Sequence, residues 1–258
     1  MTSGDARQRA RQTIIATLAA TFACDPAAWS VERNTIVAAA ALPGRLRFPI
    51  PSRPFLLASC GAGVVLSCHE SRLAWARAEL APHGRDALFS LPLLAEIDRQ
   101  LRPDGQRLHG PLLRFACDED SFRPAPQSDG ITLTLHQGEQ IRELYRYRGF
   151  ENALEYDHAS PRPDVLAVAA WCGQSLVGIA GASADSDDLW QIGVDVATAA
   201  RGAGVGRALV GTLTEAILAA GKVPYYSTTV AHLRSAAIAL GLGYWLAWSD
   251  VFARDERR

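Results

Sequence analysis

The chain has 258 residues, enough for one large domain or two smaller ones. Hydrophobic residues make up 48% and charged residues 21%, which is ordinary globular usage and excludes a disordered or fibrous protein. The formal net charge of −1 provides no basic surface of the kind that binds a phosphate backbone, so we expect no nucleic acid as partner. Two domains are our starting prediction.

The amino-terminal segment carries a short apolar run behind three arginines. Residues 13–24 mimic a signal peptide that ends at a lipidated Cys24, but the run is short and Phe22 suits a cleavage site poorly. The same residues predict an amphipathic helix with Ile14 and Leu18 on one face, which is the interpretation we favour. No other segment approaches the 18 apolar residues that a membrane span requires, so we expect no membrane association and a cytoplasmic location.

Five cysteines are spread along the chain, and their spacing matches neither a CxxC pair nor a Cys/His metal site. An odd number of scattered cysteines predicts neither a disulfide framework nor a bound metal. We interpret each as a small buried side chain in a reducing compartment. The five are Cys24, Cys60, Cys68, Cys117 and Cys172.

The first half of the chain alternates strand-like and helix-like segments. Four prolines within residues 42–54 force that stretch to be extended or a loop. A glycine-rich tripeptide at 61–63 joins two strand-like runs. The polar, proline-rich stretch 118–130 is the best boundary, so we predict domains at 1–125 and 126–258. Strands are predicted at 35–41, 55–59, 64–68 and 111–117, and helices at 70–81 and 90–101.

The second half has a more regular rhythm of strands and helices. Its apolar residues alternate in the strand-like runs and recur at helical spacing between them. Together they predict a mixed, mostly antiparallel sheet flanked by helices, of the α/β (α+β) class. Strands are predicted at 131–135, 165–172, 175–184, 189–196, 223–229 and 244–253, and helices at 139–147, 208–220 and 232–241.

A glycine-rich loop lies between the strand at 189–196 and the helix at 208–220. Glycine lets a backbone approach a ligand closely, and a helix start offers unpaired N–H groups with a partial positive charge. This order of elements predicts a cradle for a pyrophosphate. The dinucleotide motif GxGxxG is excluded because Arg207 stands where its third glycine would, and Gly221-Lys222 lacks the Ser or Thr of a P-loop. The loop reads Arg201-Gly202-Ala203-Gly204-Val205-Gly206-Arg207.

These residues resemble the GNAT superfamily of acyl-CoA-dependent N-acetyltransferases. The family signature is Gln or Arg, then two variable residues, Gly, one variable residue, and Gly or Ala; it is met by Arg201, Gly204 and Gly206. The resemblance covers about residues 131–253, and the first 125 residues show no such signature. A second family pattern follows at the expected distance on Ser235, Ala239, Gly243 and Tyr244.

The resemblance implies acetyl-CoA as co-substrate. Main-chain groups of residues 194–196 would bind the pantetheine arm and the acetyl carbonyl, and N–H groups of residues 202–207 would hold the pyrophosphate, helped by Arg201 or Arg207. Ser235 would line the other side of the coenzyme. The strand before the glycine loop and the strand after its helix would part to admit the thioester. The implied coenzyme-binding residues are Val194, Asp195, Val196, Arg201, Gly202, Ala203, Gly204, Val205, Gly206, Arg207 and Ser235.

The usual catalytic residues of the family are missing. Trp190 stands where some members carry a glutamate base, and Ala239 where many carry a tyrosine acid. His232 replaces the asparagine of the second pattern. The ordinary pKa of histidine suits a base near neutrality, and the alternative is that His232 caps its helix or replaces the hydrogen bond of that asparagine.

Other candidates for proton transfer are Glu151, Glu155 and His158. Glu151 and Glu155, four residues apart, are expected to share a helix face toward the acceptor or, alternatively, a solvated face. Tyr225 and Tyr226 point to opposite sides of a strand, so at most one faces the thioester and the other is core. The candidate catalytic residues are therefore His232, Tyr226, Glu151 and Glu155.

The leading interpretation is an acetyl-CoA-dependent N-acetyltransferase whose amine acceptor, a small molecule or a peptide, attacks the thioester directly. The alternative is a catalytically weak acyl-CoA-binding sensor or interaction module, and a third is an unrelated nucleotide-binding protein. The N-terminal α/β domain alternates strands and helices as a diverged GNAT-like copy would, and we expect it to have a structural or acceptor-shaping role. Oligomeric state is left open, with a homodimer as one option.

Overall fold

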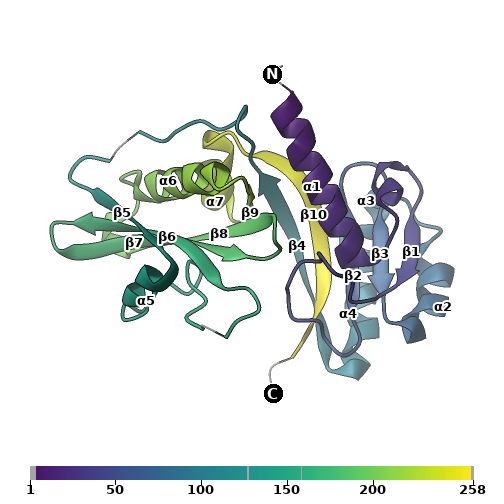
Figure 1. Cartoon of the computed structure of the whole chain (residues 1–258). Helices are drawn as coiled ribbons and strands as arrows, with labels where there is room; N and C mark the ends of the chain where they lie inside the picture. Colours follow the sequence, from purple (N-terminus) through teal and green to yellow (C-terminus); the bar gives the residue numbers. More distant parts are fainter. Residues whose placement is uncertain (1–3, 127, 158, 257–258) are drawn as a thin grey trace. The chain divides into compact units, whose positions relative to one another are not determined.

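The computed structural model describes residues 4–126, 128–157 and 159–256 (Figure 1). The chain forms two compact units, each assembled from separate parts of the sequence. No single cut in the sequence divides the chain into these two units. The predicted boundary at residue 125 stays a prediction. Unit 1 comprises residues 1–13, 115–228 and 232–246, and unit 2 comprises residues 14–114, 229–231 and 247–258.

Unit 1 is built on strands in the order β9–β8–β7–β6–β5. Neighbours from β5 to β8 pair antiparallel, whereas β8 and β9 run parallel because a helix connects them as a crossover. This mixed, mostly antiparallel sheet flanked by helices confirms the predicted fold class. The elements are β5 (Thr132–Gln137), α5 (Ile141–Leu144), β6 (Asp164–Cys172), β7 (Ser175–Ala184), β8 (Leu189–Val196), α6 (Val205–Ala219), β9 (Val223–Thr229) and α7 (Leu233–Gly241).

The two faces of this sheet carry different helices. α6 and α7 cover one face, and α5 lies on the other (Figure 1). Side chains alternate along each strand, so Ile179 packs in a cluster with Ile141 and Leu144 of α5, whereas Gly178 faces Leu209 of α6. We refer to these two sides as the α5 face and the α6 face.

Unit 2 contains the remaining strands of the sheet and a hydrophobic core of its own. Its strand order is β1–β3–β2–β10–β4, with β1 and β3 parallel and β2 antiparallel to both of its neighbours. Leu94, Ile97 and Leu101 of α4 pack in one cluster with Phe55 and Leu57 of β2. The elements are α1 (Asp5–Phe22), whose first turns belong to unit 1, β1 (Thr35–Ala38), β2 (Phe55–Ser59), β3 (Val65–Cys68), α2 (Leu73–Trp75), α3 (Arg85–Leu88), α4 (Leu91–Leu101), β4 (Gln106–Ala116) and β10 (Trp245–Asp255).

Two predicted helices differ from the helices of the structure. The helix predicted at 70–81 begins as a 3-10 turn, Glu70–Arg72, and ends as a π turn, Ala76–Leu80, with α2 between them. Its start is tightened because the His69 imidazole accepts a hydrogen bond from the backbone N–H two residues later. The helix predicted at 139–147 is shortened to α5, since hydrogen bonds three residues apart replace the α-helical pattern after it.

Candidate functional site

The strands β8 and β9 separate part-way along their length. They pair in parallel through residues 189–192 of β8 and 223–226 of β9, and both strands continue beyond these rungs. β8 keeps its pairing with β7 as far as Val196. Ile192 and Tyr226 form the last pair of the ladder, and we call this pair the parting point. Beyond it, the edge of β8 that faces β9 has no partner in the described β8–β9 ladder. The two strands part as the family resemblance implies.

The glycine loop follows β8 and leads into the first turn of α6. Gly202 and Gly204 have φ angles of +88° and +80°, in the left-handed region that glycine adopts without strain. A Cβ built on Gly202 would meet no described atom within 4 Å, and the loop is exposed. The first hydrogen bond of the helix runs from the Ala208 N–H to the Gly204 carbonyl at 3.0 Å, so the N–H groups before Ala208 precede the helical ladder. The loop thus offers N–H donors and the positive end of a helix dipole to an anion.

Each arginine that flanks the loop donates to a backbone carbonyl. Arg201 Nε donates to the Val196 carbonyl at 3.0 Å, which ties the loop to the end of β8. Arg207 Nη2 donates to the Gly241 carbonyl, at the end of α7, at 2.8 Å. A guanidinium has five N–H donors, so both exposed side chains retain donors for an anion beside the loop.

Asp195, implied to bind the coenzyme through its main chain, has a structural role for its side chain. Its carboxylate accepts hydrogen bonds from the Asn152 N–H (2.8 Å), Asn152 Nδ2 (2.7 Å) and the Ala153 N–H (3.2 Å). Gly193 permits this approach, because a Cβ there would lie 1.7 Å from the Asn152 carbonyl oxygen. Asp195 therefore holds the turn that contains Asn152 against the α5 face of the sheet.

The helix that would carry Glu151 and Glu155 on one face is not formed, and this prediction is wrong. The chain makes turns there because carboxylates of the sheet capture its backbone: Asp164, for example, accepts from the Glu155 N–H at 3.0 Å. Glu151 Oε1 accepts from the Gly149 N–H at 3.1 Å. Glu155 forms an ion pair with Arg162 at 3.2 Å. Each carboxylate thus has a partner of its own within the fold.

Tyr226 and Ser235 meet on the α6 face, at the parting point. Tyr226 Oη of β9 lies 2.7 Å from Ser235 Oγ of α7. The Tyr226 ring stands edge-on to the ring of Tyr244, with centroids 6.4 Å apart. Burial raises the pKa of Tyr226, so its hydroxyl keeps its proton at neutral pH. The candidate acid and the candidate coenzyme-lining serine therefore form one hydrogen-bonded pair.

His232 occupies the N-cap position of α7, and its side chain makes no capping hydrogen bond. The imidazole is exposed. Among the described residues, the alternative role of helix cap is thus not observed for His232. His158, another residue considered for proton transfer, lies outside the described residues.

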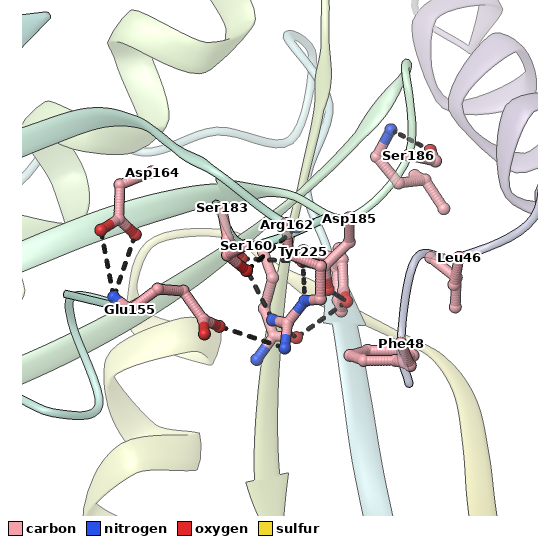
Figure 2. Close-up of polar contacts among 12 residues, drawn as sticks. Leu46, Phe48, Glu155, Ser160, Arg162, Asp164, Ser183, Asp185, Ser186 and Tyr225 are labelled. Carbon is pink, nitrogen blue, oxygen red and sulfur yellow. Dashed lines mark hydrogen bonds and ion pairs between the residues drawn. The ribbon is translucent and has the colours of Figure 1, made fainter. Parts of the chain in front are cut away.

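A buried polar cluster lies on the α5 face beside the parting point (Figure 2). The fully buried Asp185 carboxylate accepts hydrogen bonds from Arg162 Nε (2.7 Å), Ser183 Oγ (2.7 Å) and the Tyr225 hydroxyl. Tyr225 Oη also lies 2.8 Å from Gln191 Oε1. Burial, the largest single influence, would lower the pKa of Arg162, but the charge and hydrogen bond of Asp185 together with Tyr225 and Glu155 outweigh it and raise that pKa. We call these five residues the Arg162 cluster; no prediction from the sequence had joined them.

The sequence predicted neither a metal site nor a membrane span, and it predicted buried cysteines. Among the described residues, no group of three or more His, Cys, Asp or Glu side chains could hold a metal ion. No helix in the described part of the chain is long and apolar enough to cross a membrane. Cys68 and Cys117 are buried, and Cys24 and Cys60 are half-buried. The expectation of burial is wrong for Cys172, which is exposed at the hairpin end of β6.

Residues 133–244 match the model of the acetyltransferase (GNAT) family. They form a GNAT-family domain. This domain contains the glycine loop, the parting strands β8 and β9 and the Arg162 cluster, and it covers less than half of the chain. The predicted resemblance is confirmed for this region. The comparison with curated proteins found no match.

Solved structures of GNAT proteins are similar to this chain at low identity. A GCN5-related N-acetyltransferase from Kribbella flavida is 19% identical, with a TM-score of 0.48 over 65% of this chain and 65% of that one. A GCN5-related N-acetyltransferase-like protein from Streptococcus suis is 18% identical, with a TM-score of 0.46 over 62% of this chain and 67% of that one. This chain thus spans about two-thirds of the length of these relatives. At such distances neither an activity nor an acceptor carries over.

Proposed function

We propose that the GNAT-family domain binds acetyl-CoA and transfers its acetyl group to an amine by direct attack. The observation that carries this proposal is the open glycine loop at the start of α6, which follows the strand that has just parted from β9. Family membership supports an acyl thioester as the donor, and the exposed N–H groups support a diphosphate at this end of it. The proposed acceptor is an amine of a small molecule or of a peptide.

In this proposal the coenzyme lies along the part of β8 that β9 leaves. The main chain of Val194 and Val196 binds the pantetheine arm, because that edge of the strand has donors and acceptors without ladder partners in β9. The N–H groups of residues 202–207 bind the diphosphate. Arg201 and Arg207 add positive charge beside the loop.

The reaction needs a neutral amine, whereas a free alkylamine has a pKa of about 10.4 and is protonated at neutral pH. His232 is the proposed base, because no capping bond occupies its exposed imidazole. The amine nitrogen attacks the thioester carbon, and a main-chain N–H near Val196 stabilises the resulting oxyanion, a contribution of about 3 kcal/mol per donor. Collapse of this intermediate breaks the carbon–sulfur bond and expels the thiolate.

Tyr226 is the proposed proton donor to that thiolate. Its raised pKa keeps the hydroxyl protonated, and the contact with Ser235 orients it. The conjugate thiol has a pKa of about 8.5, so an acid aids departure only moderately. Glu155, paired with Arg162, and Glu151, bonded to a backbone N–H, receive no catalytic role here.

A second candidate function is an acyl-CoA-binding sensor or interaction module. Trp190 and Ala239 favour it, since they stand where some family members carry the base and many carry the acid. Ala239 is fully buried and brings no functional group of its own. Both functions require coenzyme binding, and only the enzyme requires transfer.

The experiment that tests the proposed function combines binding with turnover. Titration calorimetry measures the affinity of the whole chain for acetyl-CoA, and a thiol reagent follows release of free coenzyme A in the presence of a panel of amines and peptides. We expect binding, and thiol release that depends on one class of amine. Binding without release in any mixture would favour the sensor, and no binding at all would remove both functions.

Tyr226→Phe tests the proposed acid. Loss of the hydroxyl should lower kcat about 100-fold and leave the KM for acetyl-CoA nearly unchanged, because general acid–base catalysis acts on the transition state. Tyr145→Phe, which removes a tyrosine hydroxyl bonded to Asp164 at 2.6 Å, is the control and should keep wild-type kcat. A Tyr226→Phe enzyme as fast as wild type would exclude this residue as the acid.

A further inference from the structure

The Arg162 cluster includes the rung immediately before the parting point of β8 and β9. Gln191 and Tyr225 face each other in the parallel ladder, and the next pair, Ile192 and Tyr226, is the last. Side chains alternate along a strand, so Tyr225 points to the α5 face and Tyr226 to the α6 face. Two consecutive residues of β9 are thus held by polar contacts on opposite faces of the sheet, at the place where the strands separate.

The cluster connects β9 to three other segments of unit 1. Tyr225 Oη contacts Asp185, in the turn after β7, and Gln191 of β8. Arg162, in the loop before β6, reaches Asp185 from one side and Glu155 from the other, as Figure 2 shows. Asp185 and Tyr225 have no exposed surface, so a shifted rung would leave a buried charge or hydroxyl without its partner. This requirement disfavours any other register of the last rungs.

We propose that Tyr225 is a positioning residue that fixes where β8 and β9 part. Its hydroxyl holds the last rungs in one register. That register sets the position of the β8 main chain after Ile192, and of Tyr226, relative to the thioester. The inference rests on the proposed acetyl transfer. It concerns the reacting end of the coenzyme, because the diphosphate cradle lies on another element, the start of α6.

Steady-state kinetics of Tyr225→Phe with acetyl-CoA and an amine that supports turnover test this inference. Phenylalanine keeps the ring and removes only the hydroxyl, and Asp185 retains Arg162 and Ser183 as donors. We expect kcat to fall at least about tenfold, since a displacement of about 1 Å between reacting groups is enough to cost about 100-fold. The KM for acetyl-CoA should stay within about twofold, because the cradle is untouched.

Tyr145→Phe is the matched control, since it also deletes a tyrosine hydroxyl bonded to a carboxylate of unit 1. It should leave both kcat and KM within about twofold of wild type. Gln191→Met removes the other partner of Tyr225 and should lower kcat without raising KM, which keeps the inference testable if Tyr225→Phe does not fold. Thermal unfolding of each variant establishes which of them fold.

The outcomes separate the inference from the function on which it rests. A folded Tyr225→Phe or Gln191→Met enzyme with wild-type kcat overturns the inference and leaves the acetyl transfer standing. An equal loss of kcat in Tyr145→Phe also overturns it, because the effect would then belong to any tyrosine hydroxyl that is bonded to a carboxylate. A wild-type chain that releases no thiol with any amine overturns the proposed function, and the inference falls with it.

Discussion

The tripeptide Gly-Ala-Gly occurs twice in the chain, at residues 61–63 in unit 2 and at residues 202–204 in unit 1. In unit 1 it precedes a helix: Gly204 is the N-cap of α6, and an added Cβ at Gly202 would point into open space. The backbone N–H groups of the first turn precede the hydrogen-bond ladder of the helix and are therefore available to a ligand.

In unit 2 the same three residues join two strands, and the protein itself occupies their surroundings. The Gly63 N–H donates to the Val31 carbonyl at 2.8 Å, and Arg85 Nη1 donates to the Ala62 carbonyl at 3.3 Å. A Cβ on Gly63 would lie 2.3 Å from the Arg33 carbonyl oxygen. Glycine in a loop therefore has two uses, and the element after the loop decides between them. A helix start leaves N–H donors for a ligand, whereas a second strand allows the backbones to pack closely together.

Among these variants, Gly204→Glu should have the largest effect, on the affinity for acetyl-CoA. A carboxylate at the start of α6 repels the diphosphate, so the affinity for acetyl-CoA should fall at least about 100-fold in calorimetry. Gly173→Glu is the control, because Gly173 also has a positive φ, +58°; an added Cβ there meets no described atom within 4 Å, and at Gly204 it meets only Ser128 Oγ, at 3.3 Å. The control should bind acetyl-CoA like wild type. Equal affinities in the two variants would remove the cradle from unit 1.

Gly63→Ala tests the packing role in unit 2. The new methyl group meets the backbone of Arg33, so the free energy of unfolding should fall by about 2–3 kcal/mol in urea titrations. Acetyl-CoA affinity at a temperature where the variant is folded should not change. Gly84→Ala, where an added Cβ meets no described atom within 4 Å, is the control and should unfold like wild type. A stable Gly63→Ala protein would mean that the tight approach in unit 2 is not needed.

Asp98→Asn tests another polar group of unit 2 whose hydrogen-bond partners lie within the same unit. Asp98 accepts from the Leu108 N–H at 3.0 Å and from Arg107 Nε at 2.9 Å. Burial alone would raise the pKa of Asp98, but these hydrogen bonds and the Arg102 contact lower it to about 2. We expect the variant to lose about 1 kcal/mol of stability at neutral pH.

The pH dependence of that loss has a defined sign. A carboxyl group with a lowered pKa stabilises the fold above the unfolded value of about 3.9, and the stabilisation disappears as the pH falls toward about 2. The difference between wild type and Asp98→Asn in urea titrations should therefore shrink from pH 5 to pH 2. Asp86→Asn is the control: Arg85 also lowers the pKa of Asp86, but solvent screens this exposed pair, so the control should show a much smaller pH dependence. A difference that is constant with pH would contradict the assignment.

Thiol alkylation tests whether the interior of each unit is closed. Burial raises the pKa of Cys68 in unit 2 to about 11 and that of Cys117 in unit 1 to about 12. At pH 8 a maleimide should therefore modify the exposed Cys172 at least about tenfold faster than either buried thiol, as peptide mass analysis would show. Rapid labelling of Cys68 alone would show that unit 2 opens more readily than unit 1.

Local patterns were enough to predict most of the elements of unit 1. The alternation of residues 175–184 and 189–196 predicted β7 and β8, and the glycine loop between β8 and a helical run was recognisable because all its parts are neighbours in the sequence. The helix expected around Glu151 failed for the opposite reason. The carboxylate of Asp195, 43 positions from Asn152, captures that backbone, and no local propensity reports such a contact.

The Arg162 cluster at the candidate site also could not be predicted from local sequence patterns. Its five residues come from a loop, from β7 and the turn after it, and from two further strands, so no spacing joins them. One signal was available: Arg162 stands between two prolines directly before a buried strand, an unusual place for a charge unless it has a partner. Which partner it has depends on the register of β8 and β9, and that register follows from tertiary packing.

The side chain of Asp195 in β8 binds the turn that contains Asn152, so the side chains and the main chain of this strand have different roles. Donor recognition in the proposed enzyme uses the main chain of β8, which is the same for any side chain. The segment on the α5 face depends on the side chains of Asp195 and Asp164, and on Gly193, which has no room for a substituent. Changes in the side chains that hold this segment would therefore leave in place the main-chain groups of β8 that are proposed to bind the donor.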